Sequence, residues 1–356
     1  MIKLLIVDDS ALMRRQLTTL FQETGGFEIR QARNGKEAVE ENRNFKPDVV
    51  TLDINMPEMD GITALSLIMA ERPVPVVMVS SLTEKGALAT FEALNLGAVD
   101  YIAKPDGTIS LSIGRIKDEL IAKVQTAAKA RIKGVGSNVK GLAQRLREER
   151  EKTVPRPIAV RRGVVGEGLV VMGVSTGGPR TLEDILPLLP VDFPWPVLVA
   201  QHMPAAFTRS FAERLNTLCA LTVLEASSPM PIEPGFIYIG KGGADMVVGK
   251  RGGKLTLIPK PENREYLWHP SVELLGRSVL EHCDPSRVVA VMLTGMGYDG
   301  ADAFTDIKKQ GGRTIAESKA TAVVFGMPAE LIDRGGATLV LPLEKIAAQI
   351  NHWAGK

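Results

Sequence analysis

Three residues far apart in the sequence have the side chains that hydrolysis by a serine nucleophile requires. Ser175 lies in a Gly-x-Ser-x-Gly pattern at residues 173–177, between an apolar run and a helix-like pattern. A serine at such a strand-to-helix turn is typical of a nucleophile. His202 follows the next apolar run, and Asp299 lies in a glycine-rich loop after another. Because a histidine can take the serine proton while a carboxylate orients its ring, we predict these three residues as nucleophile, base and orienting acid.

The pattern around Ser175 alone leaves other interpretations open. A glycine-rich turn before a helix can also bind a phosphate group. The sequence has neither the lysine of a Walker loop after these glycines nor a G-x-G-x-x-G dinucleotide pattern. Asp245 is the rival orienting acid, but its glycine-rich loop gives no comparable reason for it to face Ser175. Asp302 and Asp306 have helical spacing and are expected on a solvated helix face.

A second group of polar residues follows apolar runs in the first third of the chain. These residues are Asp8, Asp9, Asp53, Ser80 and Lys104. The carboxyl ends of parallel strands lie along one edge of a sheet, so we expect the five residues to meet in one crevice. Three carboxylates repel one another unless a cation neutralises them, and an all-oxygen ligand set suits Mg²⁺. The group predicts a site for a phosphoryl group, with Asp53 as the acceptor.

Short apolar runs alternate with amphipathic stretches in both halves of the chain. In the first part we predict strands over residues 3–7, 48–52, 74–79 and 99–103, with helices over 11–22 and 35–44. In the second part we predict strands over 169–174, 196–200, 235–239, 288–293 and 337–341. Strands that alternate with helices indicate a parallel sheet covered on both faces. The expected fold is α/β, with two doubly wound parallel-sheet domains joined by a basic linker.

The charge is distributed unevenly along the chain. The 356 residues include 43 Lys and Arg and 41 Asp and Glu, a net charge of +2. Residues 1–125 have a net charge of −4 and residues 164–356 one of −2, whereas residues 126–163 have +8. We predict a domain over 1–125, a linker over 126–163 and a second domain over 164–356. The basic linker either tethers the domains or docks on an acidic surface, and the overall balance gives no reason to expect a nucleic-acid partner.

The cysteines and the apolar runs indicate the cellular compartment in which the protein is expected. The two cysteines, Cys219 and Cys283, lie far apart without CxxC spacing, which favours free thiols in a reducing compartment. No apolar run reaches the roughly 18 residues that a membrane-spanning helix needs, and the first residues are unlike a signal peptide. We expect a cytoplasmic protein that is not inserted in a membrane.

The first part resembles a known family. Residues 53–61 resemble the phosphoacceptor loop of response-regulator receivers, and residues 4–10, 76–81 and 101–105 match the same family. The resemblance implies a receiver domain in which a histidine kinase supplies the phosphoryl group for Asp53. It further implies that Asp8, Asp9 and Asp53 hold Mg²⁺. Ser80, Tyr101 and Lys104 are then the expected switch residues.

The second part resembles the CheB methylesterase family. The resemblance rests on residues 174–179, 201–204, 293–300 and 323–328. It implies a Rossmann-like methylesterase domain that hydrolyses γ-glutamyl methyl esters on methyl-accepting chemoreceptors and releases methanol. Deamidation of receptor glutamines is implied as well, because both reactions are acyl transfers. The esterase reaction is expected to need no cofactor.

Some details of the second site come only from this resemblance. It implies the backbone N–H of Met296 as an oxyanion donor, and we expect Thr176 to support the same site. Family members often have His-Met where this chain has Asp245-Met246 after Ala244, and Pro-Ser-Val-Asp where it has Pro-Ser-Val-Glu at residues 270–273. We expect neither departure to touch the triad of Ser175, His202 and Asp299.

Two other functions are weighed against a phosphorylation-regulated esterase. The second part could bind a partner without turnover, and Ser175→Ala would distinguish this function from catalysis. The third candidate function is an esterase that acts on small-molecule esters. The receiver argues against it, because control by signalling suits a protein substrate. A DNA-binding output is not supported, because the second part is net acidic and lacks a basic recognition helix. For the enzyme, we expect the unphosphorylated receiver to hinder access to Ser175.

Overall fold

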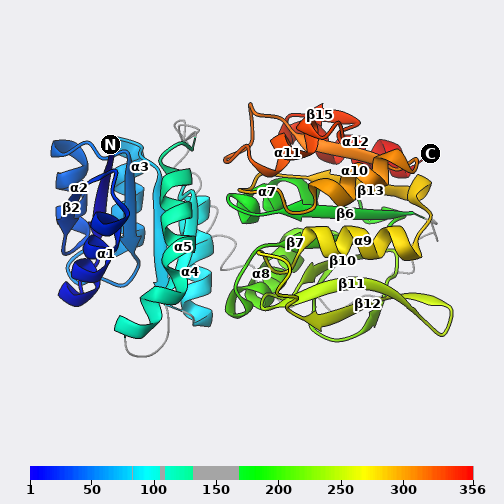
Figure 1. Ribbon diagram of the computed structural model, residues 1–356, viewed down its shortest axis with the longest axis horizontal. Coiled ribbons are helices and arrows are strands. Elements are labelled where there is room, and N and C mark those ends of the chain that lie inside the picture. The colour runs from blue at the N-terminus through cyan, green and yellow to red at the C-terminus, as the bar shows by residue number, and fades with distance from the viewer. Residues whose placement is uncertain (82, 105–108, 131–167, 356) are drawn as a thin grey trace. The chain divides into compact units, whose positions relative to one another are not determined.

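The computed structural model describes residues 1–81, 83–104, 109–130 and 168–355 (Figure 1). The chain divides into two compact units, Met1–Val154 and Pro155–Lys356. Helix α5 (Ile109–Ala127) continues past the predicted domain boundary at residue 125. The predicted linker from residue 131 onward, with its glycines, prolines and most of its basic residues, lies outside the described residues.

The first unit is a five-stranded parallel sheet with strand order β2-β1-β3-β4-β5. Helices alternate with its strands, and contacts join α1 to α5, α2 to α3, and α3 to α4. The strands are β1 (Ile2–Val7), β2 (Phe27–Ala32), β3 (Val49–Asp53), β4 (Val76–Ser81) and β5 (Asp100–Lys104). The helices besides α5 are α1 (Ala11–Thr24), α2 (Gly35–Asn44), α3 (Gly61–Glu71) and α4 (Glu84–Asn95).

Side-chain caps fix where the helices of the first unit begin. Ser10 Oγ accepts a hydrogen bond from the backbone N–H of Met13 at the start of α1. Asn34, Asp60 and Thr83 cap α2, α3 and α4 in the same way. Such a cap satisfies a backbone donor that has no partner within the helix. Because these helices begin only a few residues after β1, β2, β3 and β4, the connecting loops are short and the strand ends are held in place.

The second unit has a seven-stranded parallel sheet with strand order β15-β14-β13-β6-β7-β10-β8. Its strands are β6 (Leu169–Val174), β7 (Val197–Gln201), β8 (Thr222–Ala226), β10 (Phe236–Gly240), β13 (Val288–Met292), β14 (Arg313–Glu317) and β15 (Leu339–Leu341). The α-helices are α7 (Gly178–Ile185), α8 (Ala205–Leu218), α9 (Val272–His282), α10 (Ala301–Lys309), α11 (Met327–Asp333) and α12 (Leu343–Ala354), and the 3₁₀ turns are η1 (Leu186–Leu188) and η2 (Pro285–Arg287). The predicted fold class, two doubly wound parallel sheets, is confirmed.

An additional antiparallel sheet of three strands belongs to the second unit. It has the order β11-β12-β9, built from β11 (Ala244–Arg251), β12 (Lys254–Pro261) and β9 (Met230–Pro231). Helix α9 contacts β11 (Figure 1). The placement of Asp245 in a glycine-rich loop was therefore wrong, because Asp245 lies in β11.

The main core of the second unit lies against the parallel sheet. Buried apolar residues of α9, α10 and α11 form one cluster with residues of β6, β7, β13 and β14, and Met246, Val248 and Leu257 of the antiparallel sheet join it. All six residues of β6 are buried, as is typical of a parallel strand covered on both faces. No helix in the described part of the chain is long and apolar enough to cross a membrane.

Candidate active site and phosphoacceptor site

Ser175 and His202 lie at the point where the strand order of the second unit reverses. From β6 the chain proceeds through β7, β8 and β10 on one side, and then returns through β13, β14 and β15 on the other. Ser175 directly follows β6, and His202 directly follows β7. The His202 N–H donates to the carbonyl of Val174 over 3.1 Å. In open α/β sheets ligands bind at this kind of position.

The turn that carries Ser175 is held by its neighbours on both sides. Its N–H donates to the carbonyl of Thr294, which follows β13, over 3.0 Å. Gly177 has φ 78° at the start of α7, and a Cβ atom there would lie 2.7 Å from Cβ of Val323. A residue without a side chain is needed at such a position. The structure explains in this way why a glycine follows the serine by two residues.

Gln201 supports the site in a way that the sequence did not suggest. Its side chain is buried, and its Nε2 donates to the carbonyls of both Ser175 and His202, each over 3.0 Å. One amide group therefore ties the predicted nucleophile to the predicted base. A glutamine before a histidine gives no such indication, because the contact exists only once β6 and β7 are paired.

His202 and Asp299 are joined by a hydrogen bond. Nε2 of His202 lies 2.8 Å from Oδ2 of Asp299, and the two side chains are only 9% and 3% exposed. Because an ionised carboxylate only accepts, a neutral His202 has its proton on Nε2 and a lone pair on Nδ1. Nδ1 is buried and has no hydrogen-bond partner among the described residues. His202 thus keeps its basic nitrogen available.

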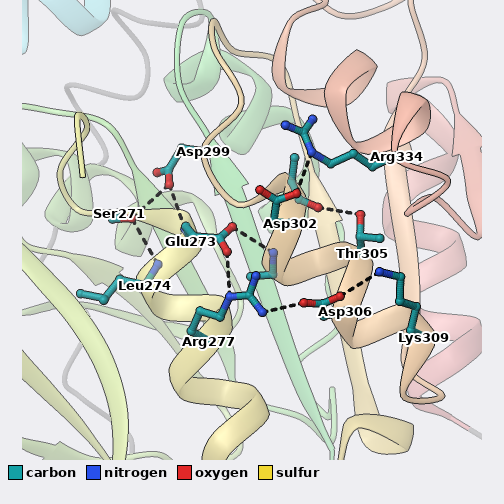
Figure 2. Close-up of polar contacts among 12 residues, drawn as sticks. Ser271, Glu273, Leu274, Arg277, Asp299, Asp302, Thr305, Asp306, Lys309 and Arg334 are labelled. Carbon is teal, nitrogen blue, oxygen red and sulfur yellow. Dashed lines mark hydrogen bonds and ion pairs between the residues drawn. The ribbon is translucent and has the colours of Figure 1, made fainter. Parts of the chain in front are cut away.

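Asp299 is held by three further donors. Oγ of Ser271 and the N–H of Glu273 donate to its Oδ1 over 3.0 and 2.9 Å (Figure 2). The N–H of Val272 donates to its Oδ2 over 2.7 Å. Burial alone would raise the pKa of Asp299. The hydrogen bond and charge of His202, together with the backbone donors, outweigh burial and hold that pKa below its usual value. The carboxylate is thereby kept ionised.

The expectation that neither departure from the family pattern touches the triad was wrong for Glu273. Its backbone N–H binds Asp299, while its carboxylate turns away and accepts from Arg277 Nε over 2.8 Å and from the N–H of Ala303 over 2.9 Å (Figure 2). Burial raises the pKa of the Glu273 carboxyl. The side chain therefore joins α9 to the start of α10, beside the loop that presents Asp299.

Asp245 acts on the triad indirectly. It does not contact Ser175, His202 or Asp299 in any described hydrogen bond, which agrees with its rejection as the orienting acid. Its Oδ1, however, accepts from the N–H of Ser271 over 2.8 Å. Because Ser271 also binds Asp299, Asp245, the other departure from the family pattern, is separated from the triad by one residue.

Trp268 covers one side of His202. Its ring lies 5.9 Å from the imidazole centroid with an interplanar angle of 6°, and Tyr298 contacts it edge-on at 5.2 Å. Tyr298 and Leu267 are exposed, at 50% and 72%. The contact of Trp268 with His202 was not predicted from the sequence, because Trp268 lies in a polar stretch that contains no motif. Stacking of this kind holds the imidazole ring in one orientation.

The predicted oxyanion supports lie beside Ser175 through the loop after β13. A Cβ atom on Gly295 would lie 2.8 Å from Cβ of Ser175, so the residue just before Met296 packs against the serine. Thr176 is buried, and its carbonyl accepts from Oγ1 of Thr294 over 2.9 Å. The chain thus brings Thr176 and Met296 to the serine turn, and their role toward an oxyanion stays a prediction.

Asp302 and Asp306 lie on the solvated face of α10, as predicted. Asp302 accepts from Arg334 over 2.8 Å and Asp306 from Arg277 over 2.6 Å (Figure 2). Their side chains are 61% and 31% exposed. Surface ion pairs of this kind contribute about 0–1 kcal/mol each, so we assign both residues to the surface of α10.

The first unit brings the three aspartates predicted to hold a cation together at its own switch point. Asp8 and Asp9 follow β1 and Asp53 ends β3, the two neighbouring strands between which the strand order reverses. One carboxylate oxygen from each of the three lies within 4.8 Å of the others. Lys104 Nζ lies 2.8 Å from Asp53 and 3.0 Å from Asp8. Four of the five residues that we expected to meet at this sheet edge, Asp8, Asp9, Asp53 and Lys104, therefore lie close together.

Charge and burial affect the titration of this group in opposite ways. Burial, with the nearby charge of Asp8, raises the pKa of Asp53 more than Lys104 lowers it. Burial alone would lower the pKa of Lys104, but Asp53 and Asp8 outweigh this effect and raise it. A crowded set of carboxylates with one ammonium group favours the binding of a cation.

Two of the three predicted switch residues, Ser80 and Tyr101, are buried, and Lys104 is half-buried. Ser80 Oγ donates to the carbonyl of Gly86 over 3.2 Å. Tyr101 is buried, and Lys123 Nζ lies 5.1 Å from its ring centroid and donates to its carbonyl over 2.7 Å. Burial raises the pKa of Tyr101 well above its usual value. Tyr101 therefore points inward in this structure.

Comparison with known proteins identifies both parts. Residues 4–112 match the response regulator receiver domain, and residues 170–350 match the CheB methylesterase domain. The chain belongs to the CheB methylesterase family. A Rhodospirillum rubrum protein named protein-glutamate methylesterase/protein-glutamine glutaminase 3 is 55% identical, over 100% of this chain and 97% of its own. A Rhodopseudomonas palustris protein with the same name, numbered 2, is 52% identical, over 99% and 98%.

The CheB fold is found in a solved structure as well. The crystal structure of the CheB methylesterase catalytic domain of Thermotoga maritima matches 53% of this chain and 99% of that chain, with 41% identity and a TM-score of 0.51. The family predicted from the motifs is confirmed. The two relatives match nearly the whole length of this chain, so the matched region includes the receiver part.

Proposed function

We propose that this chain hydrolyses γ-methyl esters of glutamate side chains on chemoreceptors, with Ser175 as the nucleophile. The observation that carries the proposal is the hydrogen bond of 2.8 Å between His202 and Asp299 at the sheet edge next to Ser175. This arrangement leaves a lone pair on Nδ1 of His202, which follows the strand next to that of the half-buried Ser175, in a chain that belongs to the CheB family.

In the first step Oγ of Ser175 attacks the ester carbonyl while Nδ1 of His202 takes its proton. The imidazole is then protonated on both nitrogens, and Asp299 stabilises this cation through Nε2. The tetrahedral intermediate collapses, the C–O bond to the methoxy group breaks, and His202 returns the proton to that oxygen. Methanol leaves, and an acyl group remains on Ser175.

In the second step a water molecule replaces methanol. Nδ1 of His202 takes a proton from the water molecule while the water oxygen attacks the acyl carbon. The bond between the acyl carbon and Oγ of Ser175 then breaks, and His202 returns the proton to Oγ. The products are a glutamate carboxyl group and the free enzyme. A glutamine side chain would react by the same two steps and release ammonia, so we propose deamidation as a second reaction.

We assign stabilisation of the oxyanion to backbone N–H groups beside Ser175. Met296 follows Gly295, which packs against the serine, and Thr176 lies in the turn at the start of α7. Such donors stabilise the charge that develops on the carbonyl oxygen.

We propose that the first unit regulates this reaction through phosphorylation of Asp53 by a histidine kinase in the cytoplasm. The clustered oxygens of Asp8, Asp9 and Asp53 fit Mg²⁺, which would neutralise the carboxylates and the incoming phosphoryl group. Lys104 would bind a phosphoryl oxygen, and Ser80 and Tyr101 would respond to it. We further propose a receiver over 1–125, a linker over 126–163 and a catalytic domain over 164–356, with the unphosphorylated receiver hindering access to Ser175.

The test is methanol release from a methylated chemoreceptor fragment, with and without a small-molecule phosphodonor and Mg²⁺. We expect release by the full chain, faster with the phosphodonor, and a loss of about 10⁴- to 10⁶-fold for Ser175→Ala. Ser227→Ala, an exposed serine, is the matched control and should keep full activity. Absence of methanol under both conditions contradicts the enzyme and favours a binding module.

A further inference from the structure

We infer that Asp245 is a positioning residue for the triad, because it fixes the loop of residues 262–271 from which both Trp268 and Ser271 reach the site. This inference rests on the proposed function. It assigns a role in the reaction to a residue that itself touches neither substrate nor base.

Asp245 is a buried carboxylate whose two oxygens are both used. It is 1% exposed. Oδ1 accepts from the N–H of Ser271 over 2.8 Å and from Nδ1 of His269 over 2.9 Å, and Oδ2 accepts from the N–H of Asn263 over 2.9 Å. Burial of a charge is costly unless such donors surround it. The three donors come from both ends of one loop, so the carboxylate holds that loop closed against β11.

From Asp245 one path leads to Asp299 through a single residue. Ser271 donates its N–H to Asp245 and its hydroxyl to Asp299, over 2.8 and 3.0 Å. The next two N–H groups, of Val272 and Glu273, also bind Asp299 (Figure 2 shows Ser271 and Glu273 beside it). A shift of Ser271 would therefore move three of the four donors that orient the Asp299 carboxylate.

A second path leads to His202. Trp268 directly precedes His269, whose ring is bound to Asp245, and Trp268 stacks on the imidazole of His202. Because the two paths end on His202 and on Asp299, Asp245 is connected to both members of the hydrogen bond between them. An anchor needed only for stability would not have to reach either residue.

The variant that tests this role is Asp245→Asn, which keeps the size but replaces one acceptor by an NH₂ group that cannot accept a hydrogen bond. We expect kcat for methanol release to fall about 10- to 100-fold, as when a residue that orients a catalytic ligand is lost, with KM within about twofold. Glu262→Gln, an exposed carboxylate of the same loop, is the matched control and should retain the wild-type kcat. A wild-type kcat for Asp245→Asn overturns the inference.

A second readout separates this inference from the proposed function. Labelling of Ser175 by a fluorophosphonate needs His202 and Asp299 but no chemoreceptor. A wild-type chain that is labelled but releases no methanol contradicts the proposed substrate. Asp245→Asn labelled at the wild-type rate overturns the role of Asp245, whatever the substrate is. Labelling slowed to the same extent as kcat supports it.

Two further variants guard against a simple loss of folding. Asp245→Glu keeps the charge but not all three hydrogen bonds, and we expect it to lose about tenfold in kcat with a native circular dichroism spectrum. Combined with Ser271→Ala, Asp245→Asn should cost less than the product of the two single losses, because Asp245 fixes the N–H of Ser271 and part of its effect on Asp299 passes through the Ser271 hydroxyl. The inference is overturned if the losses in kcat of the two single variants multiply in the double variant. It is also overturned if Asp245→Glu keeps the wild-type kcat.

Discussion

Nε2 of His202, and not Nδ1, faces Asp299 across 2.8 Å. In the serine-protease arrangement the acid binds Nδ1 and leaves Nε2 for the serine. Here the acid binds the other ring nitrogen, so Nδ1, which is next to the backbone, is the nitrogen left for the proton transfer from Ser175 that we propose. Ser175 and His202 follow the paired strands β6 and β7, so their backbones are adjacent.

Asp299→Asn should lower kcat by roughly 10³- to 10⁴-fold, the order of loss seen when the orienting acid of a serine triad becomes an amide. The amide can donate to Nε2, which favours the tautomer with the proton on Nδ1 and removes the base. Steady-state methanol release measures the loss. Asp302→Asn, on the solvated face of α10, should stay within about twofold of the wild type. Equal activities for the two variants would contradict the triad.

Asp299 should also make stability depend on pH in the acid range. Its pKa in the folded chain lies below the ordinary value of 3.8, so the folded state binds a proton there less readily than the unfolded chain does. The contribution is complete above pH 3.8 and is lost as pH falls through the folded pKa. The difference in unfolding free energy between the wild type and Asp299→Asn should therefore shrink below that pH. Urea titrations at a series of pH values measure it, and a constant difference would refute this prediction.

Gly177→Ala should destabilise the second unit by about 2–4 kcal/mol, because a left-handed backbone and a contact of the new Cβ with Val323 act together. Gly252→Ala provides the matched control, since it has φ 56° with no atom within 4 Å of its added Cβ. It should cost only about 1–2 kcal/mol. All three tryptophans, Trp195, Trp268 and Trp353, lie in this unit, so fluorescence follows its unfolding by urea. Equal costs would show that Val323 moves aside.

Asp53→Asn should abolish phosphorylation by a small-molecule phosphodonor, because the amide is not a nucleophile for the phosphoryl group. Electrophoresis that separates the phosphorylated form measures this. The exposed Asp118→Asn should be phosphorylated normally. In the methanol assay, Asp53→Asn should keep the basal rate and lose the increase with phosphodonor, whereas a retained increase would contradict control through Asp53.

The sequence was sufficient to predict the candidate site residues that lie at the ends of strands. Ser175, His202, Asp8 and Asp53 were predicted to lie at sheet edges, and the parallel register of the apolar strands places them there. The predicted strand bounds differ by only one or two residues, because a run of buried apolar residues identifies a central parallel strand well.

What the sequence could not predict depends on contacts between distant segments. Strand β11 has six buried or half-buried residues after two glycines, and the glycines suggested a loop. Trp268 and Asp245 acquire their roles only when the loop after β12 folds back onto β11 and His202. Spacing along the chain contains no information about such contacts, so these residues had no motif to identify them.

The bridge made by Gln201 has a consequence for how the enzyme responds to heat. Because one buried amide binds the carbonyls of both Ser175 and His202, the backbones of these two residues cannot separate while this side chain keeps its two hydrogen bonds. Partial loosening of the site would leave a buried amide without partners, which is costly. Activity and the central strands should therefore be lost together on warming, in a single cooperative transition.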